Sequence, residues 1–229
     1  MMKAIRNNIP NAITSLNLLF GCMACIAALS KGCLVAPYIV AFELIALSAV
    51  ADFLDGLVAR WLHAVSAIGK ELDSLADLVS FGLAPALILY SMMPEDGPWA
   101  FFALLLPVFG ALRLARFNVD TNQATTFTGL PIPANAIFWI GFTDWYYHQQ
   151  DCPVWIVVLL IVVMSLLMVC PLRMFSLKMH NLSSLKQNWA QYLQVIATVV
   201  FVIVMGLPGL ALAIMLYVLL SIIKREDHN

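Results

Sequence analysis

The chain has 229 residues, of which 62% are hydrophobic and only 11% are charged, and its mean hydropathy is +0.92. A soluble domain of this size does not carry so much apolar sequence, so the composition predicts a polytopic membrane protein. The formal net charge is −1, and without a dense basic patch nucleic acid is not an expected partner. The five cysteines form neither a disulfide framework nor a metal-ligand pattern.

Apolar segments long enough to span a membrane recur along the whole chain. A membrane helix needs about 20 mostly apolar residues, and eight segments meet or approach that length. They are residues 13–29, 34–54, 73–92, 99–117, 132–147, 154–170, 192–205 and 207–223. We therefore expect an all-α fold, a polytopic membrane helix bundle that forms a single integral membrane domain over residues 1–229.

The basic residues predict how this bundle is oriented. If both termini are cytoplasmic, eleven of the twelve Lys and Arg side chains fall on the cytoplasmic side, and only Lys31 falls outside. Such a bias is typical of inner-side loops. It favours an even number of spans, and six would satisfy it as well as eight. The eleven cytoplasmic residues are Lys3, Arg6, Arg60, Lys70, Arg113, Arg116, Arg173, Lys178, Lys186, Lys224 and Arg225.

Two aspartate pairs lie at the expected cytoplasmic ends of the second and third helices. Asp52 and Asp55 are three residues apart and Asp73 and Asp77 are four apart, so each pair shares one helical face. We expect Gly69 to let the intervening segment reverse. Four gathered carboxylates repel one another and resist desolvation, so divalent cations are their natural partners. Oxygen ligands favour Mg²⁺, Mn²⁺ or Ca²⁺, and a pair of such ions suits phosphoryl chemistry.

Small and polar residues surround the aspartates. Gly56 and Ala59 leave one helix face bare, either for a bulky polar ligand or for helix packing. Arg60 offers a planar fork that suits phosphate oxygens, or it anchors a helix end in the cytoplasm. Ser66 donates a hydroxyl to a ligand or caps a turn.

The whole pattern has the form Asp-x2-Asp-Gly-x2-Ala-Arg-x8-Gly-x3-Asp-x3-Asp, from Asp52 to Asp77. It resembles the signature of the CDP-alcohol phosphatidyltransferase family at every defined position. Members are integral membrane enzymes, usually dimeric, with a core of six membrane helices. They transfer a phosphatidyl group from a CDP-linked lipid to an alcohol and release CMP. The resemblance implies a catalytic core over residues 1–190, about two additional C-terminal helices over 191–229, a homodimer, and a bacterial inner-membrane location with a cytoplasmic active site.

The resemblance also implies roles for single residues. Two divalent ions would be held by Asp52, Asp55, Asp73 and Asp77, and Asp77 would double as the general base. We expect direct displacement without a covalent enzyme intermediate, because no activated nucleophile stands beside the cluster. The residues expected to contact the CDP-lipid are Gly56, Ala59, Arg60, Ser66, Gly69 and Asn17.

Looser similarities narrow the choice of acceptor. Residues 9–14, 17–21, 71–82, 113–118 and 127–133 resemble the serine-using bacterial members of the family. They favour CDP-diacylglycerol as donor and L-serine as acceptor, while glycerol 3-phosphate and inositol phosphate remain alternatives. Arg113 and Arg116 share a helical face and, with Asn118, are candidates to bind the acceptor. The other interpretation is that both arginines only anchor the helix or touch lipid headgroups.

Two other classes of protein also use membrane aspartates. An intramembrane prenyltransferase binds Mg²⁺ and a pyrophosphate, but its acidic motifs lie in separate parts of the chain. A divalent-cation transporter usually places its carboxylates near the membrane midplane rather than at one boundary. The prenyltransferase alternative also leaves Gly56, Ala59 and Arg60 unexplained.

Overall fold

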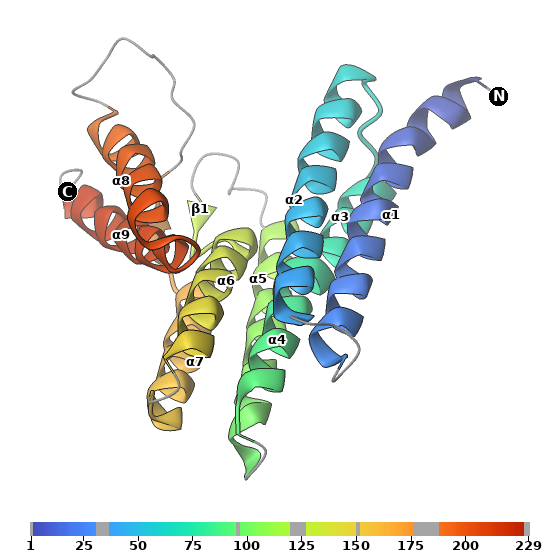
Figure 1. Ribbon diagram of the computed structural model, residues 1–229. Coiled ribbons are helices and arrows are strands. Elements are labelled where there is room, and N and C mark those ends of the chain that lie inside the picture. Colours follow the sequence, from blue (N-terminus) through green and yellow to red (C-terminus); the bar gives the residue numbers. More distant parts are fainter. Residues whose placement is uncertain are drawn as a thin grey trace. The chain divides into compact units, whose positions relative to one another are not determined.

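The computed structural model describes residues 2–30, 37–94, 97–119, 127–149, 152–175 and 188–226. Within these ranges the chain is built from helices, together with one short pair of strands (Figure 1). The chain divides into two compact units, Met1–Leu114 and Ala115–Asn229, each of which is described by itself. The expected all-α fold is therefore confirmed.

The described part of the N-terminal unit consists of four continuous helices. α1 spans Met2–Leu29 and α2 spans Pro37–Trp61. The third helix is made of α3 (Ala67–Asp77), the π-helical segment η1 (Leu78–Leu83) and α4 (Ala84–Met92) in direct succession. The 3-10 segment η2 (Pro98–Leu104) leads into α5 (Leu105–Val119), which continues past the unit boundary. α1 packs against α2, α3, η1 and α4, so it contacts both helices that carry the aspartate pairs.

The C-terminal unit contains four further helices in its described residues. They are α6 (Ile132–His148), α7 (Val154–Val169), α8 (Trp189–Met205) and α9 (Pro208–Glu226). α9 packs against both α6 and α8. The strands β1 (Phe127–Thr128) and β2 (Arg173–Met174) pair antiparallel, with Phe127 opposite Met174.

Each of the eight expected spans corresponds to one of these helices, but the first three helices are longer than expected. The third begins at Ala67 because Ser66 caps it: the Ser66 hydroxyl oxygen accepts a hydrogen bond from the backbone N–H of Gly69 at 3.0 Å. The expectation that the chain reverses at Gly69 is wrong. Gly69 lies in the first turn of α3, and the reversal follows Trp61, where His63 adopts a left-handed φ of 49°.

Within the described ranges, four helical segments are long and apolar enough to cross a membrane: Asn8–Leu29, Pro37–Trp61, Ala67–Met92 and Pro98–Val119. Val154–Val169, Trp189–Met205 and Pro208–Lys224 are apolar but shorter. The cytoplasmic placement of both termini stays a prediction. Of the basic residues behind it, Lys31, Lys178 and Lys186 lie outside the described residues, as do the side chains of Lys3, Arg6 and Arg225.

A glycine lets α6 and α9 approach closely. A Cβ atom built on Gly141 would lie 2.5 Å from the backbone nitrogen of Ala211 and 2.8 Å from the carbonyl oxygen of Leu207. Both neighbours are backbone atoms, which cannot move aside as a flexible side chain can. Close packing through small residues is typical of membrane helices.

Replacing Gly141 with Ala is expected to lower the free energy of unfolding by about 1–3 kcal/mol, because the added methyl group overpacks the α6–α9 contact. Gly56→Ala is the matched control, since a Cβ built on Gly56 meets no atom within 4 Å. Alanine is favoured over glycine inside a helix by about 0.5–1 kcal/mol, so this control should not destabilise. Thermal unfolding of both variants in one detergent checks the prediction, and equal midpoints would contradict it.

Candidate active site

The helices α2 and α3 bring the acidic residues together. One carboxylate oxygen from each of Asp52, Asp55 and Asp73 lies within 4.8 Å of the other two. The Asp52 carboxyl is also within hydrogen-bonding reach of both Asp73 and Asp77. The cluster therefore joins the last turns of α2 to the body of α3. The connection between these helices is short, because α2 ends at Trp61 and α3 begins at Ala67.

The burial of this cluster fits a bound cation. Asp55 is only 6% exposed, and Thr14 on α1 is its hydrogen-bonding neighbour. The buried oxygens Asp55 Oδ2 and Asp73 Oδ1 have no hydrogen-bond partner among the described residues. A buried carboxylate oxygen without a partner is costly unless it binds a metal or a donor. Carboxylate oxygens alone favour Mg²⁺, Mn²⁺ or Ca²⁺, so the residues present fit such a group.

A pocket of about 430 Å³ opens beside the cluster, within the N-terminal unit. Its wall includes three of the aspartates together with the small residues Gly56, Ala59 and Gly69. No atom lies within 4 Å of a Cβ built on Gly56, so the bare helix backbone is accessible there. The lining residues are Pro10, Asn11, Thr14, Asp52, Asp55, Gly56, Ala59, Arg60, Ala64, Val65, Ser66, Gly69, Lys70 and Asp73.

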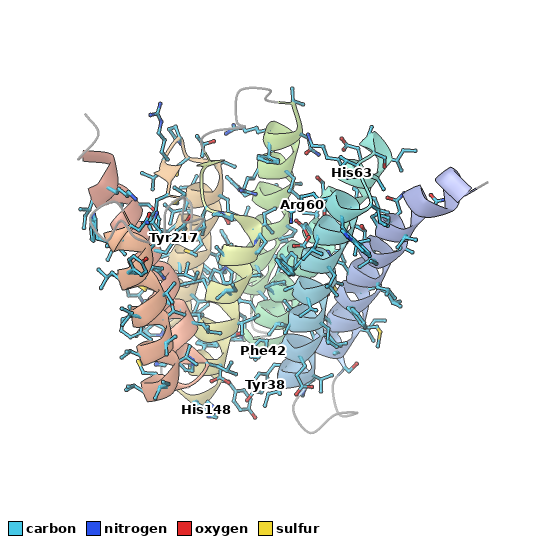
Figure 2. The ribbon with its side chains drawn as sticks, turned by 90° about the horizontal axis from the view of Figure 1, so that it is seen from above. Tyr38, Phe42, Arg60, His63, His148 and Tyr217 are labelled. Carbon is cyan, nitrogen blue, oxygen red and sulfur yellow. The ribbon has the colours of Figure 1, made fainter. Side chains whose placement is uncertain are left out.

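Arg60 and Ser66 line the pocket, and each also makes a hydrogen bond to a nearby backbone group. Arg60 Nε donates to the carbonyl oxygen of Gly56 at 3.0 Å, which leaves the two terminal nitrogens as the donors for a ligand. Ser66 caps α3 and also lines the pocket, so both sequence interpretations of this residue have a structural basis. Figure 2 shows Arg60 and His63 at one end of α2, with Tyr38 and Phe42 at the opposite end.

Several lining residues were not assigned a role from the sequence. Pro10, Asn11 and Thr14 come from α1, and Lys70 comes from the first turn of α3. The spacing of Asn11 and Thr14 places both on one face of α1, which was the available signal. From the sequence, Lys70 was only one of the basic residues that predict the orientation of the chain in the membrane.

Asn17, which was expected to contact the CDP-lipid, does not line the pocket. It is fully buried, at 0% exposure. Its side-chain nitrogen donates to Asp77 Oδ1 at 3.5 Å, and its side-chain oxygen accepts from Ser80 at 2.8 Å. Asp77 is likewise absent from the pocket lining and lies against Asp52 and Asp73.

The three acceptor candidates all lie on α5. Arg113 belongs to the N-terminal unit, whereas Arg116 and Asn118 belong to the C-terminal unit. Arg116 Nη1 donates to the carbonyl oxygen of Val169 at 3.0 Å, and therefore satisfies a carbonyl at the C-terminal end of α7. An acceptor role for these residues stays a prediction.

Comparison with known proteins agrees with the motif. A sequence model of the CDP-alcohol phosphatidyltransferase family matches residues 7–149. Two proteins named CDP-diacylglycerol–serine O-phosphatidyltransferase, from Helicobacter pylori strains 26695 and J99, are 32% and 34% identical to this chain. Each match covers 94% of this chain and 90% of the relative. A protein of the same name from Methanocaldococcus jannaschii is 48% identical over 44% of this chain and 49% of its own length.

Removing one carboxylate from the cluster should weaken divalent-cation binding. For Asp55→Asn we expect a loss in Mn²⁺ affinity at least as large as the roughly 10–100-fold that loss of an outer-shell partner typically costs. Asp144→Asn is the control, because Asp144 lies on α6 in the other unit. Calorimetric titration of the purified protein with Mn²⁺ measures both affinities. Unchanged binding by Asp55→Asn would contradict the metal assignment.

Proposed function

The chain belongs to the CDP-alcohol phosphatidyltransferase family, and we propose that it transfers the phosphatidyl group of CDP-diacylglycerol to L-serine, giving phosphatidylserine and CMP. One observation carries the proposal: seven of the eight defined motif positions line a single pocket, and the eighth, Asp77, lies against the same carboxylate cluster. The relatives that match almost the full length of the chain carry the serine enzyme's name. These relatives support serine as the acceptor.

The pocket wall suits the nucleotide end of the donor. Arg60 directs its terminal guanidinium nitrogens to phosphate oxygens, and Gly56 and Ala59 leave room for the diphosphate beside the helix backbone. Ser66 caps α3 and Gly69 lies in its first turn, where backbone N–H groups favour an anionic group. Lys70 adds a second positive charge at the same turn.

The four aspartates would hold divalent cations, either Mg²⁺ or Mn²⁺, with Ca²⁺ as a further candidate, and two ions would match the number of carboxylates. When bound, such ions stabilise negative charge that develops on the diphosphate. Asp55 and Asp73 contribute the buried oxygens that have no other partner in the described part of the chain.

Asp77 acts as the general base. It takes the proton of the serine hydroxyl as the serine oxygen forms a bond to the phosphorus that carries the diacylglycerol. The bond from that phosphorus to the CMP oxygen breaks, and CMP leaves. A carboxylate is a weak base near its reference pKa of about 3.9, so accurate positioning must supply much of the rate.

Arg113, Arg116 and Asn118 are our candidates for binding the serine carboxylate. The same groups would also suit the phosphate of glycerol 3-phosphate or inositol phosphate, which are the alternative acceptors. We place the enzyme in the bacterial inner membrane as a homodimer, with this pocket facing the cytoplasm. Residues 1–229 then form one membrane domain, with the catalytic core within 1–190 and additional helices in 191–229.

The acceptor is tested by giving the purified enzyme labelled CDP-diacylglycerol with serine, glycerol 3-phosphate or inositol phosphate in turn. We expect CMP release and a phosphatidylserine product with serine alone. Product formed only with a phosphate-bearing acceptor would overturn serine but keep the reaction type. Failure to release CMP with any of the three would overturn the reaction and favour a transporter or prenyltransferase.

Asp77→Asn should reduce turnover by about 10²–10⁴-fold, the usual contribution of a positioned general base. The amide keeps the size of the side chain, so binding of CDP-diacylglycerol should be largely retained. CMP release and donor binding are measured on the same preparation. A variant with wild-type turnover would show that another group accepts the proton.

A further inference from the structure

Asn17 connects three helices beneath the acidic cluster. Its backbone carbonyl oxygen lies within hydrogen-bonding distance of the hydroxyl of Ser48 on α2, at 3.2 Å, and of the hydroxyl of Ser80 on η1, at 3.1 Å. Its side chain meets Ser80 and Asp77. Asn17, Ser48 and Ser80 are all fully buried, each at 0% exposure. Such a buried polar cluster restricts the conformations that its members can adopt.

The Ser80 hydroxyl determines which end of the Asn17 amide faces Asp77. The Ser80 hydroxyl has one hydrogen and two acceptors within reach, Asn17 Oδ1 at 2.8 Å and the Asn17 carbonyl oxygen at 3.1 Å. The contact with Oδ1 is the shorter one, so the amide oxygen is turned toward η1. The NH₂ group is then left on the side of Asp77, where it donates to Oδ1 at 3.5 Å. A reversed amide would place its oxygen against the Asp77 carboxylate and repel it. The bond to Asp77 is long, as catalytic hydrogen bonds often are before substrate binds.

The backbone around Ser80 is shaped to make this contact. The π-helical segment η1 begins at Leu78, directly after Asp77, and contains Ser80. On α1, a Cβ atom built on Gly21 would collide with Ser80 Oγ and approach its Cα to 2.9 Å. Only glycine at position 21 therefore allows Ser80 to come this close to α1. π-Helical turns occur frequently at functional sites.

We propose that Asn17 and Ser80 form a positioning pair that fixes the orientation of the Asp77 carboxylate. Ser80 sets the amide orientation, and the Asn17 NH₂ group holds one oxygen of Asp77. The other oxygen is then presented in one orientation for the proton of the acceptor hydroxyl. The inference rests on the proposed function, in which Asp77 is the general base. It assigns Asn17 a different role from the CDP-lipid contact that the sequence suggested.

Ser48 provides a matched control for Ser80. Both serines are fully buried, and both hydroxyls lie within hydrogen-bonding distance of the Asn17 carbonyl oxygen. The second acceptor within reach of Ser80 is the Asn17 side-chain amide, whereas that of Ser48 is the carbonyl oxygen of Leu44 on its own helix. Ser80→Ala and Ser48→Ala remove the same hydroxyl from equally buried positions. A purely structural role would make their effects equal. A positioning role makes them differ in kcat.

The experiment measures kcat and KM for CDP-diacylglycerol and the thermal midpoint of wild type, Ser80→Ala, Ser48→Ala and Asn17→Leu. We expect Ser80→Ala and Asn17→Leu to lower kcat by about ten-fold or more, since small misplacement of a reacting group is costly. KM and the thermal midpoint of Ser80→Ala should stay close to those of Ser48→Ala, which should keep kcat near wild type.

Equal kcat values for Ser80→Ala and Ser48→Ala, whether both high or both low, would overturn the positioning pair. If Asn17→Leu does not fold, the serine comparison still decides the question. A wild-type enzyme that releases no CMP would instead refute the proposed function. Failure of the positioning pair and failure of the proposed function can therefore be told apart.

Discussion

Mutual repulsion of carboxylates is the constraint on which the N-terminal unit depends. Asp52, Asp55 and Asp73 bring oxygens within 4.8 Å of one another, and Asp77 lies against two of them. In a segment of such low polarity this arrangement is unfavourable unless positive charge is bound there. The site is therefore strongly predisposed to cations, and the cations in turn suit an anionic diphosphate. Metal binding, donor binding and the stability of α2 against α3 are expected to be coupled.

α1 contributes further lining residues to the pocket and a hydrogen bond to Asp77, neither of which comes from the acidic motif. It lines the pocket through Pro10, Asn11 and Thr14 and reaches the Asp77 carboxylate through Asn17. Gly21, one turn further along, lets the π-helical segment approach closely enough for Ser80 to orient that asparagine. One helix outside the acidic motif thus contacts both the pocket and the proposed base. Small residues make this possible, because they let polar groups meet without separating the helices.

The choice of serine as acceptor and the proposed transfer of a phosphatidyl group are supported by different observations. The chemistry follows from the grouping of carboxylates, a guanidinium and bare helix backbone around one pocket. The acceptor follows from relatives that cover nearly the full chain and from candidates on α5. Arg116 already satisfies the carbonyl of Val169, so an acceptor role would have to share or release that bond. A different acceptor would therefore leave the residues proposed to bind the donor unchanged.

Hydropathy and helical spacing are local properties, so the amino-acid sequence was sufficient to predict the helical class, the eight apolar segments and the grouping of the four aspartates. Those properties could not reveal that the chain reverses near His63 rather than Gly69, since the Ser66 cap places Gly69 inside the first turn of α3. They also could not place Asn17 beside Asp77, sixty residues away. That contact was decided by the packing of α1 against η1, where Gly21 and Ser80 meet. Long-range hydrogen bonds arise only when separate helices pack, so the tertiary structure alone distinguishes a pocket residue from a positioning residue.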